Sequence, residues 1–410
     1  MTGAPAGPKK GRARFPARAL RIYRSGKRTV FAGTRLGYLR FRELFMLPAC
    51  YRRFRANEDC GRSGTGLASD LLTWFFSYNT LPTHYAKYRL WEVDRKDWKY
   101  YYASNYRASQ EARLKRVVQP LEYRILFTDK YVCVLLCQAL GIPIPRTYGV
   151  LEPALDYRRQ LEVWLTASSA GKLIVKPLGG RAGRDIVLAE RAGNGPVIRS
   201  GITVVPLGEF ILKEKAIIQD FVAQHPGLAA FSSSSVNTLR VVTMVTPQDE
   251  IIVINAALRT GVGRAFVDNW SAGGVAAGID CETGRLKKHA YDKKGRRYVA
   301  HPTSGVVFEG YPIPEWERVH AAALAIQRAF SFYRMLGLDI ALDPDGQPVL
   351  IEINYGPDLT FSEQTSGPLF KMERVLRAFG EYDLLVNKHQ RRLYAQLATP
   401  QTPLSKAKDR

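Results

Sequence analysis

The sequence predicts an α+β protein that folds into more than one domain. Its 410 residues are too many for one compact core, so two or three domains are expected. Apolar runs typical of strands are interspersed with segments whose apolar residues recur at helical spacing. The composition, 46% hydrophobic and 24% charged, is ordinary for a globular protein. A basic, aromatic-rich N-terminal region precedes these elements.

The N-terminal region carries more than half of the net charge of +23. Residues 9–53 contain fourteen Lys or Arg and one acid, Glu43. This imbalance indicates an anionic partner, which is a nucleic acid, an anionic lipid surface or an acidic substrate. Aromatic residues and leucines are interleaved with the basic ones, which suits a membrane surface and equally suits RNA. A solubilising arm, partly disordered like the Pro/Gly/Ala-rich residues 1–10, is the third interpretation.

Features of the chain favour a cytoplasmic location. No stretch of 18 apolar residues is present, so a transmembrane helix is not expected. The basic N-terminus lacks an apolar signal core, so secretion is not expected either. The five cysteines form no CxxC pair, which favours reduced thiols over a disulfide framework. Cys133 and Cys137 are interpreted as core thiols, because no His or further Cys completes a metal site. Association with a membrane through the basic arm is left open.

After the basic arm, the sequence predicts a short helix and an aromatic layer. Residues 60–66 are rich in Gly and predict a loop, after which Ser69 is expected to cap a helix over 70–78. Tyr and Trp are dense between residues 84 and 107. Such density can stack nucleobases, but it more often forms a packing layer, and we favour packing. The residues concerned are Tyr85, Tyr88, Trp91, Trp98, Tyr100, Tyr101, Tyr102 and Tyr106.

From about residue 121 helices and strands alternate. A helix is expected over 131–140 and a second, amphipathic helix over about 154–169. Residues 172–177 are β-branched and apolar until Lys176, which predicts a strand. A glycine-rich loop then leads to another expected strand over 185–189.

The second half of the chain predicts a sheet and further helices. The turn-forming residues 246–250 separate two apolar runs and predict two adjacent strands. Pro314 lies at the start of a helical pattern that Gly337 is expected to end. A further helix is expected over about 366–380, and the tail after residue 395 is expected to fray. The expected strands cover 216–222, 236–245 and 251–258.

A polar β-hairpin is predicted around the turn at residues 343–346. This cluster of Asp, Pro and Gly lies between two apolar runs. Because side chains alternate along a strand, Leu350, Glu352 and Asn354 are expected to share one face, with Asp339 of the partner strand nearby. Two carboxylates and an amide oxygen on rigid strands suit a hard divalent cation that carries phosphates. The alternative is a surface hairpin whose acids are solvated.

Lys176 ends an apolar strand and precedes a glycine-rich loop. A charged residue at such a place needs a partner or a cleft. The glycines Gly179, Gly180 and Gly183 would let backbone N–H groups approach an anion closely, and Arg181 adds charge. The loop fits neither the Walker A nor the dinucleotide-binding pattern. The alternative is a tight hairpin without a ligand.

An arginine, Arg240, lies within a predicted apolar strand, and Arg259 lies where the next strand ends. An arginine within a strand is commonly a member of a buried ion pair. It can equally present its planar fork to a phosphate or a carboxylate.

The order of these features resembles the ATP-grasp superfamily. Over residues 120–365 the chain has a strand ending in Lys-Pro, a glycine-rich loop, a hinge strand, an Arg within a strand, and an Asp followed by Glu-x-Asn. Each motif is weak alone, but their ordered combination is much more specific. Residues 235–243 and 350–354, together with the aromatic N-terminal region, look most like the sugar-transfer-associated ATP-grasp group. The resemblance implies two α+β lobes that grip ATP, and it leaves the arm before residue 60 unmatched.

The resemblance also implies ATP and Mg²⁺ as ligands and assigns residues to them. ATP would be bound by Lys130, Lys176, Gly179, Gly180, Arg181 and Gly183, with its base read by the hinge residues Gln219, Asp220, Phe221 and Val222. The metal would be held by Asp339, Glu352 and Asn354. The catalytic set would be Arg240, Lys176 and Arg259, and the acceptor would lie near Asn269, Gly273 and Gly274. Many members have an acid after the hinge for the ribose, whereas this chain has Gln224 or His225, so the ribose contact stays open.

The activity implied is the ligation of a carboxylate to an amine. The carboxylate attacks the γ-phosphate of ATP, and an amine then displaces phosphate from the acyl phosphate. No protein nucleophile is needed, which agrees with the lack of a convincing Ser/His/Asp or Cys/His set. A kinase that phosphorylates its acceptor, and an inactive module that binds nucleic acid or membrane, are the alternatives. The name of the group implies a setting near polysaccharide or glycoconjugate assembly.

The expected organisation has five parts and a small set of partners. The substrates would be small-molecule or glycoconjugate carboxylates and amines, with an anionic membrane surface as a further option and nucleic acid not favoured. The oligomeric state stays open. The parts are a basic arm over 1–58, an aromatic-rich helical domain over 59–120, a small lobe over 121–210, a large lobe with the metal site over 211–385 and a tail over 386–410.

Overall fold

A computed structural model describes most of the chain after its basic arm. The described residues are 43–57, 59–78, 80–102, 108–179, 185–201, 203–263, 270 and 273–398. The chain divides into two compact units, Met1–Thr83 and His84–Arg410. No helix in the described part of the chain is long and apolar enough to cross a membrane.

Two helices form the described part of the first unit, one over residues 43–55 and α2 over Gly64–Tyr78. Helix α2 begins earlier than expected, so Ser69 lies inside it and is not its cap. Ser63 takes that place, because its hydroxyl accepts the backbone N–H of Gly66 at 3.1 Å. Asp70 is fully buried in α2 and is held by Arg62, with Nε and Oδ2 3.0 Å apart.

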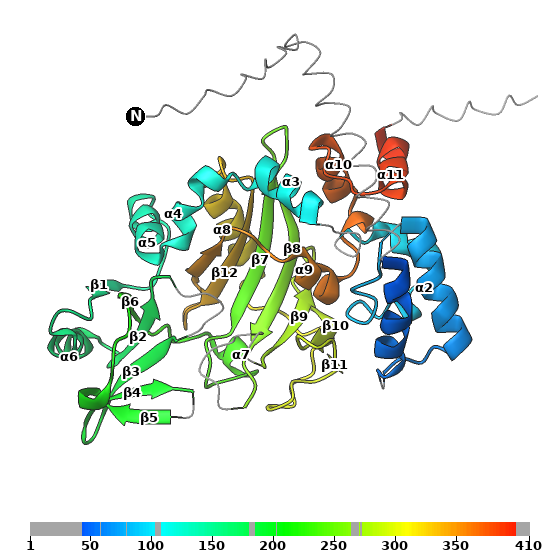
Figure 1. Cartoon of the computed structure of the whole chain (residues 1–410). Coiled ribbons are helices and arrows are strands. Elements are labelled where there is room, and N and C mark those ends of the chain that lie inside the picture. The colour runs from blue at the N-terminus through cyan, green and yellow to red at the C-terminus, as the bar shows by residue number, and fades with distance from the viewer. Residues whose placement is uncertain are drawn as a thin grey trace, which may run out of the picture. The chain divides into compact units, whose positions relative to one another are not determined.

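The second unit contains two antiparallel sheets with helices packed on them, which confirms the predicted α+β class (Figure 1). The small lobe has a six-stranded sheet in the order β1-β6-β2-β3-β4-β5, and the large lobe has a seven-stranded sheet in the order β11-β10-β9-β8-β7-β12-β13. The small-lobe strands are β1 (Thr147–Leu151), β2 (Lys172–Pro177), β3 (Val187–Ala192), β4 (Gly195–Ser200), β5 (Thr203–Pro206) and β6 (Ala216–Asp220). The large-lobe strands are β7 (Thr238–Val245), β8 (Ile251–Thr260), β9 (Val275–Ile279), β10 (Leu286–Tyr291), β11 (Arg297–Tyr298), β12 (Met335–Leu342) and β13 (Pro348–Asn354).

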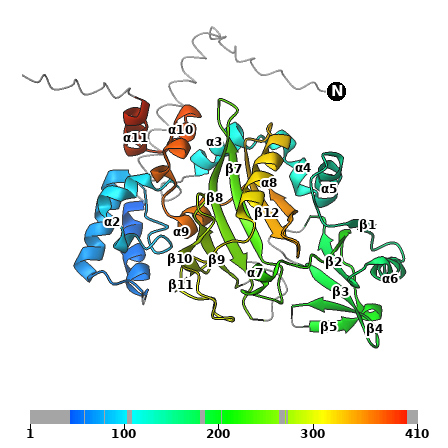
Figure 2. The same ribbon diagram turned by 180° about the vertical axis from the view of Figure 1, so that it is seen from behind.

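Helices cover the sheets and build one core in each lobe. In the small lobe, Leu161 and Leu165 of α6 pack with Val175 of β2. In the large lobe α8 covers one face, seen in Figure 2, and α9 lies on the other face. The helices of this unit are α3 (Ala108–Val118), α4 (Ile125–Thr128), α5 (Lys130–Ala139), α6 (Tyr157–Ala167), α7 (Pro226–Ala229), α8 (Trp316–Ala329), α9 (Leu359–Ser366), α10 (Glu373–Glu381) and α11 (Lys388–Ala398).

Most of the expected helices and strands are present. The start of α5 shows how a local sequence signal fixes one of them. Asp129 caps α5, because its Oδ1 accepts the backbone N–H groups of Tyr131 at 2.9 Å and Val132 at 3.1 Å. This cap fixes Lys130 at the first position of the helix. Strands β2, β7 and β8 agree with the predicted strands to within a few residues, whereas β3 begins at Val187 and not at residue 185.

Two helix boundaries differ from the prediction. Helix α8 ends at Ala329, and Gly337 lies inside β12 opposite Asn354. A Cβ at Gly337 would come within 3.0 Å of Pro357, so this glycine allows close packing and is not a helix stop. The helix expected over about 366–380 is interrupted, because Gly367 has φ +92° and ends α9, and α10 starts at Glu373.

The aromatic residues after the first unit form a packing layer, as predicted for those that the structure describes. Tyr85, Trp98 and Tyr102 are almost completely buried. The Tyr102 ring packs edge-on against Phe379, with ring centroids 4.9 Å apart. Its backbone N–H donates to Oε1 of Glu363 in α9 at 2.7 Å. The layer therefore packs against α10 and is hydrogen-bonded to α9. Tyr106 lies outside the described residues.

Candidate functional site

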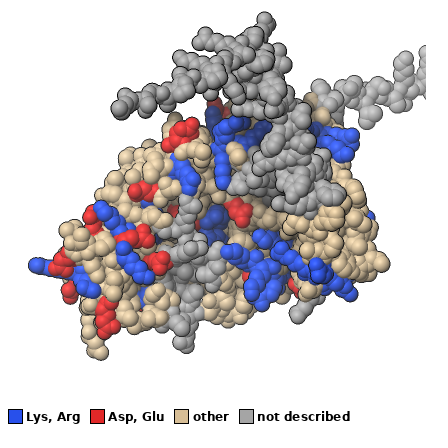
Figure 3. Space-filling model, in the orientation of Figure 1, with Lys and Arg blue, Asp and Glu red and all other residues tan. Residues whose placement is uncertain are grey.

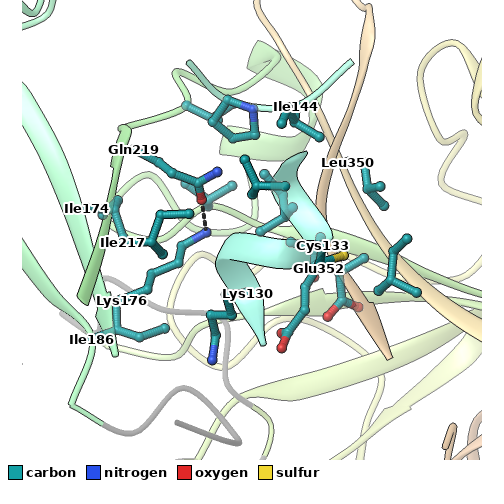
Figure 4. A pocket seen from close by; sticks show the side chains of 18 of the residues that line it. Lys130, Cys133, Ile144, Ile174, Lys176, Ile186, Ile217, Gln219, Leu350 and Glu352 are labelled. Atoms are coloured by element: carbon teal, nitrogen blue, oxygen red, sulfur yellow. Dashed lines mark hydrogen bonds between the residues drawn. The ribbon is translucent and has the colours of Figure 1, made fainter. Parts of the chain in front are cut away.

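A cavity of about 200 Å³ lies between the two sheets of the second unit. Strands β2 and β6 supply one wall, and β7, β12 and β13 supply the other, with α5 at one side. Figure 4 shows Ile174, Ile186 and Ile217 on the small-lobe side of this cavity. The charged residues that line it are Lys130, Lys176, Asp220, Arg240, Arg259, Asp339 and Glu352.

The register of the large sheet brings the predicted polar residues together. Asp339 of β12 lies opposite Glu352 on β13 and opposite Arg240 on β7. Because directly opposite residues of antiparallel strands share a face, these three side chains point to the same side. Arg259 near the end of β8 reaches the same group. Residues far apart in the sequence thus form one charged cluster.

A β-bulge in β13 corrects one expectation about its face. Asp339 pairs with Glu352, whereas the next residue, Ile340, pairs with Leu350, so Ile351 is an extra residue in β13. The bulge reverses the alternation at this point. Leu350 therefore pairs with Ile340 in the apolar core and no longer alternates in step with Glu352, although both residues line the cavity (Figure 4). Strict alternation was wrong for this strand.

Asp339 is the centre of the charged cluster. Its carboxylate accepts from Nη2 of Arg240 at 2.8 Å and also pairs with Nε of that arginine. Nη1 of Arg259 lies 3.2 and 3.1 Å from its two oxygens, and the amide nitrogen of Asn354 lies 3.2 Å away. Burial alone would raise the pKa of Asp339, but the two arginines outweigh it and hold the pKa at about 2. Asp339 is therefore ionised and fixes both guanidinium groups.

Glu352 is the second carboxylate, and no described residue pairs with it. It is open to the cavity, yet the protein around it displaces bulk water and raises its pKa. The Asp339 carboxylate raises the pKa further, while Lys130 and Lys176 act in the opposite direction. Because the charged form of Glu352 is disfavoured in this environment, a cation that enters the cavity would stabilise that form.

Lys176 of β2 and Lys130 at the start of α5 approach the same end of the cavity. Nζ of Lys176 donates to Oε1 of Gln219 at 2.9 Å, and Gln219 in turn donates to Thr147 at 3.1 Å (Figure 4). Nζ of Lys130 lies 3.4 Å from the carbonyl oxygen of Leu178. Burial lowers the pKa of both lysines, that of Lys176 to about 8. The sequence pattern did not predict the bond between Lys176 and Gln219.

A family comparison is decisive at this point. The model of the family described as sugar-transfer associated ATP-grasp matches residues 109–375. The match covers more than half of the chain and includes every strand of both sheets. The chain belongs to this family. The resemblance predicted from the sequence is confirmed, and no curated protein matches the chain.

Solved structures of similar fold are distant in sequence. N5-carboxyaminoimidazole ribonucleotide synthetase, in an ADP complex, is 12% identical with a TM-score of 0.32, covering 57% of this chain and 46% of that one. The ATP-grasp ligase PsnB, complexed with minimal precursor, Mg and ADP, is 12% identical with a TM-score of 0.36, covering 65% and 62%. D-cycloserine synthetase DcsG is 16% identical with a TM-score of 0.35, covering 63% and 73%. The chain thus spans about half of the first protein and less than two thirds of the second. Identities and TM-scores this low carry no conclusion about substrate or reaction.

The hinge of this ATP-grasp chain offers fewer backbone groups than its four residues suggest. The N–H of Asp220 donates to the carbonyl of Arg146 at 2.9 Å, and that of Phe221 to Lys172 at 3.2 Å. Both groups therefore extend the sheet. The N–H of Val222 bonds no described backbone group, and this residue lines the cavity. Among the last three of the predicted hinge residues, Val222 is thus the one whose N–H has no backbone partner among the described residues.

The two residues considered for the ribose have structural partners instead. The Gln224 amide nitrogen donates to the carbonyls of Ser232 at 2.8 Å and Ser235 at 2.7 Å. Nδ1 of His225 accepts the N–H of Gly227 at 3.0 Å and caps α7. Neither residue lines the cavity. The ribose contact stays unassigned.

The remaining predicted site residues lie at the edges of the described region. Gly179 lines a neighbouring cavity, whereas Gly180, Arg181 and Gly183 lie outside the described residues. Asn269 also lies outside them. Gly273 and Gly274 precede β9 and do not line the cavity between the lobes.

The cysteines of α5 contribute to the cavity wall, which sequence reasoning did not predict. Cys137 is buried in the large-lobe core and Cys133 packs against it, so their interpretation as core thiols is confirmed. Both also line the cavity. A hydrogen bond to Cys137, together with burial, raises the pKa of the Cys133 thiol. Their spacing of one helical turn was the available signal that they face the same side.

The side-chain oxygens of the predicted metal-binding residues are of the kind that bind a hard cation. Among the described residues, no three His, Cys, Asp or Glu side chains form a metal-binding group. The predicted set therefore depends on two carboxylates and the amide of Asn354. That amide uses its nitrogen to bond Asp339, which leaves its oxygen available. With Glu352 unpaired beside it, the two residues offer oxygen ligands of the kind that Mg²⁺ prefers. Both oxygens of Asp339, by contrast, already accept hydrogen bonds from Arg240 and Arg259.

Surface charge outside the site is unevenly distributed. Figure 3 shows Lys and Arg side chains gathered over β10 and β11, whereas both charges are interspersed over the small lobe. Several of these cations have acidic partners, such as Arg296 with Asp292 at 2.7 Å and Lys288 with Glu309 at 3.8 Å. Residues 1–42, which hold most of the basic arm, lie outside the described residues. An anionic partner of the arm therefore stays a prediction.

Proposed function

We propose that this ATP-grasp protein is an ATP- and Mg²⁺-dependent ligase that joins a carboxylate to an amine through an acyl phosphate. The observation that carries the proposal is the charge at one end of the cavity. There, four basic side chains surround two carboxylates, which leaves a surplus of two positive charges. Phosphate groups of a nucleotide are the matching partner for such a surplus. The basic residues are Lys130, Lys176, Arg240 and Arg259.

The other end of the cavity suits a purine base. The side chains of Ile174 and Ile217 on the small lobe and Val236 on the large lobe are apolar and line it. Flat apolar walls with a few placed polar groups are typical of nucleotide sites. The N–H of Val222 would then donate to a ring nitrogen of the base. A bound nucleotide would therefore lie with its base at the apolar end of the cavity and its phosphates at the basic end.

The protein groups would act on the phosphates as follows. Lys176 would bind the phosphate oxygens from the small-lobe sheet, and Lys130 would bind them from the start of α5. Arg240 and Arg259 would stabilise charge on the transferred phosphate, and they need no reorganisation because Asp339 already holds them. Bound Mg²⁺ would be held by Glu352 and the oxygen of Asn354, and it would neutralise part of the phosphate charge. Asp339 would join them as a ligand only by releasing one of its hydrogen bonds to Arg240, Arg259 or Asn354.

The bond changes need no protein nucleophile. An oxygen of the substrate carboxylate bonds to the γ-phosphorus as the bond from that phosphorus to the β-phosphate oxygen breaks, and ADP leaves. The amine then attacks the acyl carbon, phosphate departs, and the amine loses a proton. The family description names sugar transfer, and on that support we propose substrates from polysaccharide or glycoconjugate assembly.

Calorimetric titration with Mg·AMPPNP tests the nucleotide site. Saturable binding with one site per chain is expected, and its absence would end the proposal. Product analysis then separates ligation from the kinase alternative. An amide with free phosphate is the ligase outcome, whereas a stable phosphorylated acceptor would show phosphate transfer alone.

A further inference from the structure

A second cavity adjoins the nucleotide cavity at its phosphate end. Its volume is about 670 Å³, larger than that of the first. The two cavities share five lining residues, which are Phe127, Lys130, Glu352, Ile353 and Asn354. A molecule in the second cavity would therefore lie directly beside the groups that we assign to the phosphates and the metal.

Two separate parts of the chain form the outer walls of this cavity. One is the end of α3 and the residue after it, through Leu114, Lys115 and Gln119. The other is the loop over 355–358 after β13 together with Leu359 and Thr360 in the first turn of α9. Neither wall contributes to the nucleotide cavity. The second cavity is thus built by its own elements and joins the first only at the shared residues.

Gln119 is an unusual residue for such a wall. Only 3% of its surface is exposed, and its side-chain nitrogen has no hydrogen-bond partner among the described residues. Its backbone N–H is satisfied by the carbonyl of Lys115 at 3.1 Å, so the unpaired group belongs to the side chain alone. A buried amide without a partner is unfavourable unless a ligand or a water satisfies it. The nitrogen itself has almost no accessible surface, so a polar ligand in the cavity would bond this amide through its oxygen, which accepts no hydrogen bond from a described residue.

The other uncharged side chains of the cavity indicate which polar groups would fit. Thr128, Asn354 and Thr360 line it together with Gln119. Amides and hydroxyls both donate and accept hydrogen bonds, and so do the hydroxyls of a ligand. The cavity is lined by the cations Lys115 and Lys130 and by the acids Asp129, Glu352 and Asp358. Of the two cations, Lys130 lies at the inner end, so a carboxylate is favoured beside its ammonium group. The two ends of the cavity therefore select different groups of one molecule.

We propose that the second cavity binds the substrate to be activated, and that this substrate is a hydroxyl-bearing carboxylate of the sugar-acid class. Its carboxylate would lie at the inner end beside Lys130, and its hydroxyls would bond Gln119 at the outer end. The inference rests on the proposed function, because the carboxylate would take the γ-phosphate from ATP as described above. Gln119 is then a specificity-determining residue that contacts neither ATP nor metal.

The test compares two carboxylates of similar ring size, D-glucuronate and cyclohexanecarboxylate, by calorimetric titration into the full chain saturated with Mg·AMPPNP. D-glucuronate is expected to bind at least several-fold more tightly, because only it offers hydroxyls to Gln119. In Gln119→Leu its Kd should rise roughly three- to tenfold, the effect of one or two neutral hydrogen bonds. The Kd of cyclohexanecarboxylate should not rise in that variant.

The control variant is Gln138→Leu, an exposed glutamine on α5 that lines neither cavity, and it should bind D-glucuronate like the wild type. Gln119→Met, of similar length and unbranched, serves if the Leu variant does not fold. Equal affinity for the two carboxylates, or unchanged D-glucuronate binding in the Gln119 variants, would overturn the inference. Loss of Mg·AMPPNP binding by the wild type would instead overturn the proposed function, so the two failures are distinct.

Discussion

Arg240 and Asp339 face each other across β7 and β12 and form a two-point ion pair. Asp339 also pairs with Arg259, so one buried carboxylate holds two guanidinium groups in place. Burying charges is costly, and such a cluster persists only where its members satisfy one another. In the proposed ligase, this cluster keeps two cations aimed at the cavity before any substrate arrives.

Replacing Asp339 should lower the stability of the fold. In Asp339→Asn both arginines lose their anionic partner while they stay half-buried. We expect the free energy of unfolding to fall by about 3–5 kcal/mol, the usual cost of breaking a buried ion pair from one side. Denaturant unfolding measures this. The control Glu309→Gln removes an exposed partner of Lys288 and should change stability by less than about 1 kcal/mol. Equal stability of the two variants would show that the cluster is not structural.

Glu352→Gln should separate function from stability. No described residue pairs with Glu352, so the variant loses no ion pair, and its folded-state pKa is raised, which means that its charge is unfavourable in the fold. Stability at neutral pH should therefore not fall. Any gain should disappear as the pH drops below the ordinary range of a glutamate, where both forms are uncharged. Turnover and the Mg²⁺ dependence of AMPPNP binding should be lost. A variant with normal turnover would remove this hairpin from the mechanism.

Local pattern was enough to place the strands that carry the site. Lys176 ends an apolar run and the turn at 343–346 separates two such runs, so both elements could be read directly. The pairing of Arg240 with Asp339 could not, because these residues are 99 positions apart and meet only through the sheet order. Nothing local marked the bulge at Ile351 either, since a bulge depends on how two strands meet.

The sequence also could not predict which residues of separate elements meet around a cavity. Gln119 looks like an ordinary polar residue at a helix end, and only the fold shows that it is buried and unpaired. Gln219 was predicted as a hinge residue, but its bond to Lys176 depends on the pairing of β2 with β6. Period and propensity describe single elements, whereas these contacts are decided between elements.

Nucleotide binding should depend on pH through Lys176. Burial lowers its pKa to about 8, so in the empty protein the charged form is replaced by the neutral form as the pH rises through that value. Phosphates bind the charged form, so the Kd of Mg·AMPPNP should rise between pH 7 and 9 in the wild type. Lys176→Arg keeps its charge over this range and should lose the rise, although its own Kd will be higher. Lys172→Arg, an exposed position on the same strand, should keep the wild-type profile. A flat wild-type profile would exclude Lys176 as the phosphate ligand that titrates.

The close approach of α9 to the large sheet should limit substitution at Gly278. A Cβ there would overlap the backbone carbonyl of Thr365, and a backbone group cannot move aside as a flexible side chain can. Gly278→Ala should therefore push α9 away from β9 and cost roughly 1–3 kcal/mol of unfolding free energy. Helix α9 begins directly after the loop that forms one wall of the second cavity. The KM of the carboxylate substrate proposed to bind there should therefore rise more than the Kd of Mg·AMPPNP. Gly193→Ala is the matched control, since a Cβ there meets nothing within 4 Å, and it should leave both quantities unchanged. If Gly278→Ala raised the Kd of Mg·AMPPNP as much as the KM of the carboxylate substrate, α9 would position the nucleotide site too.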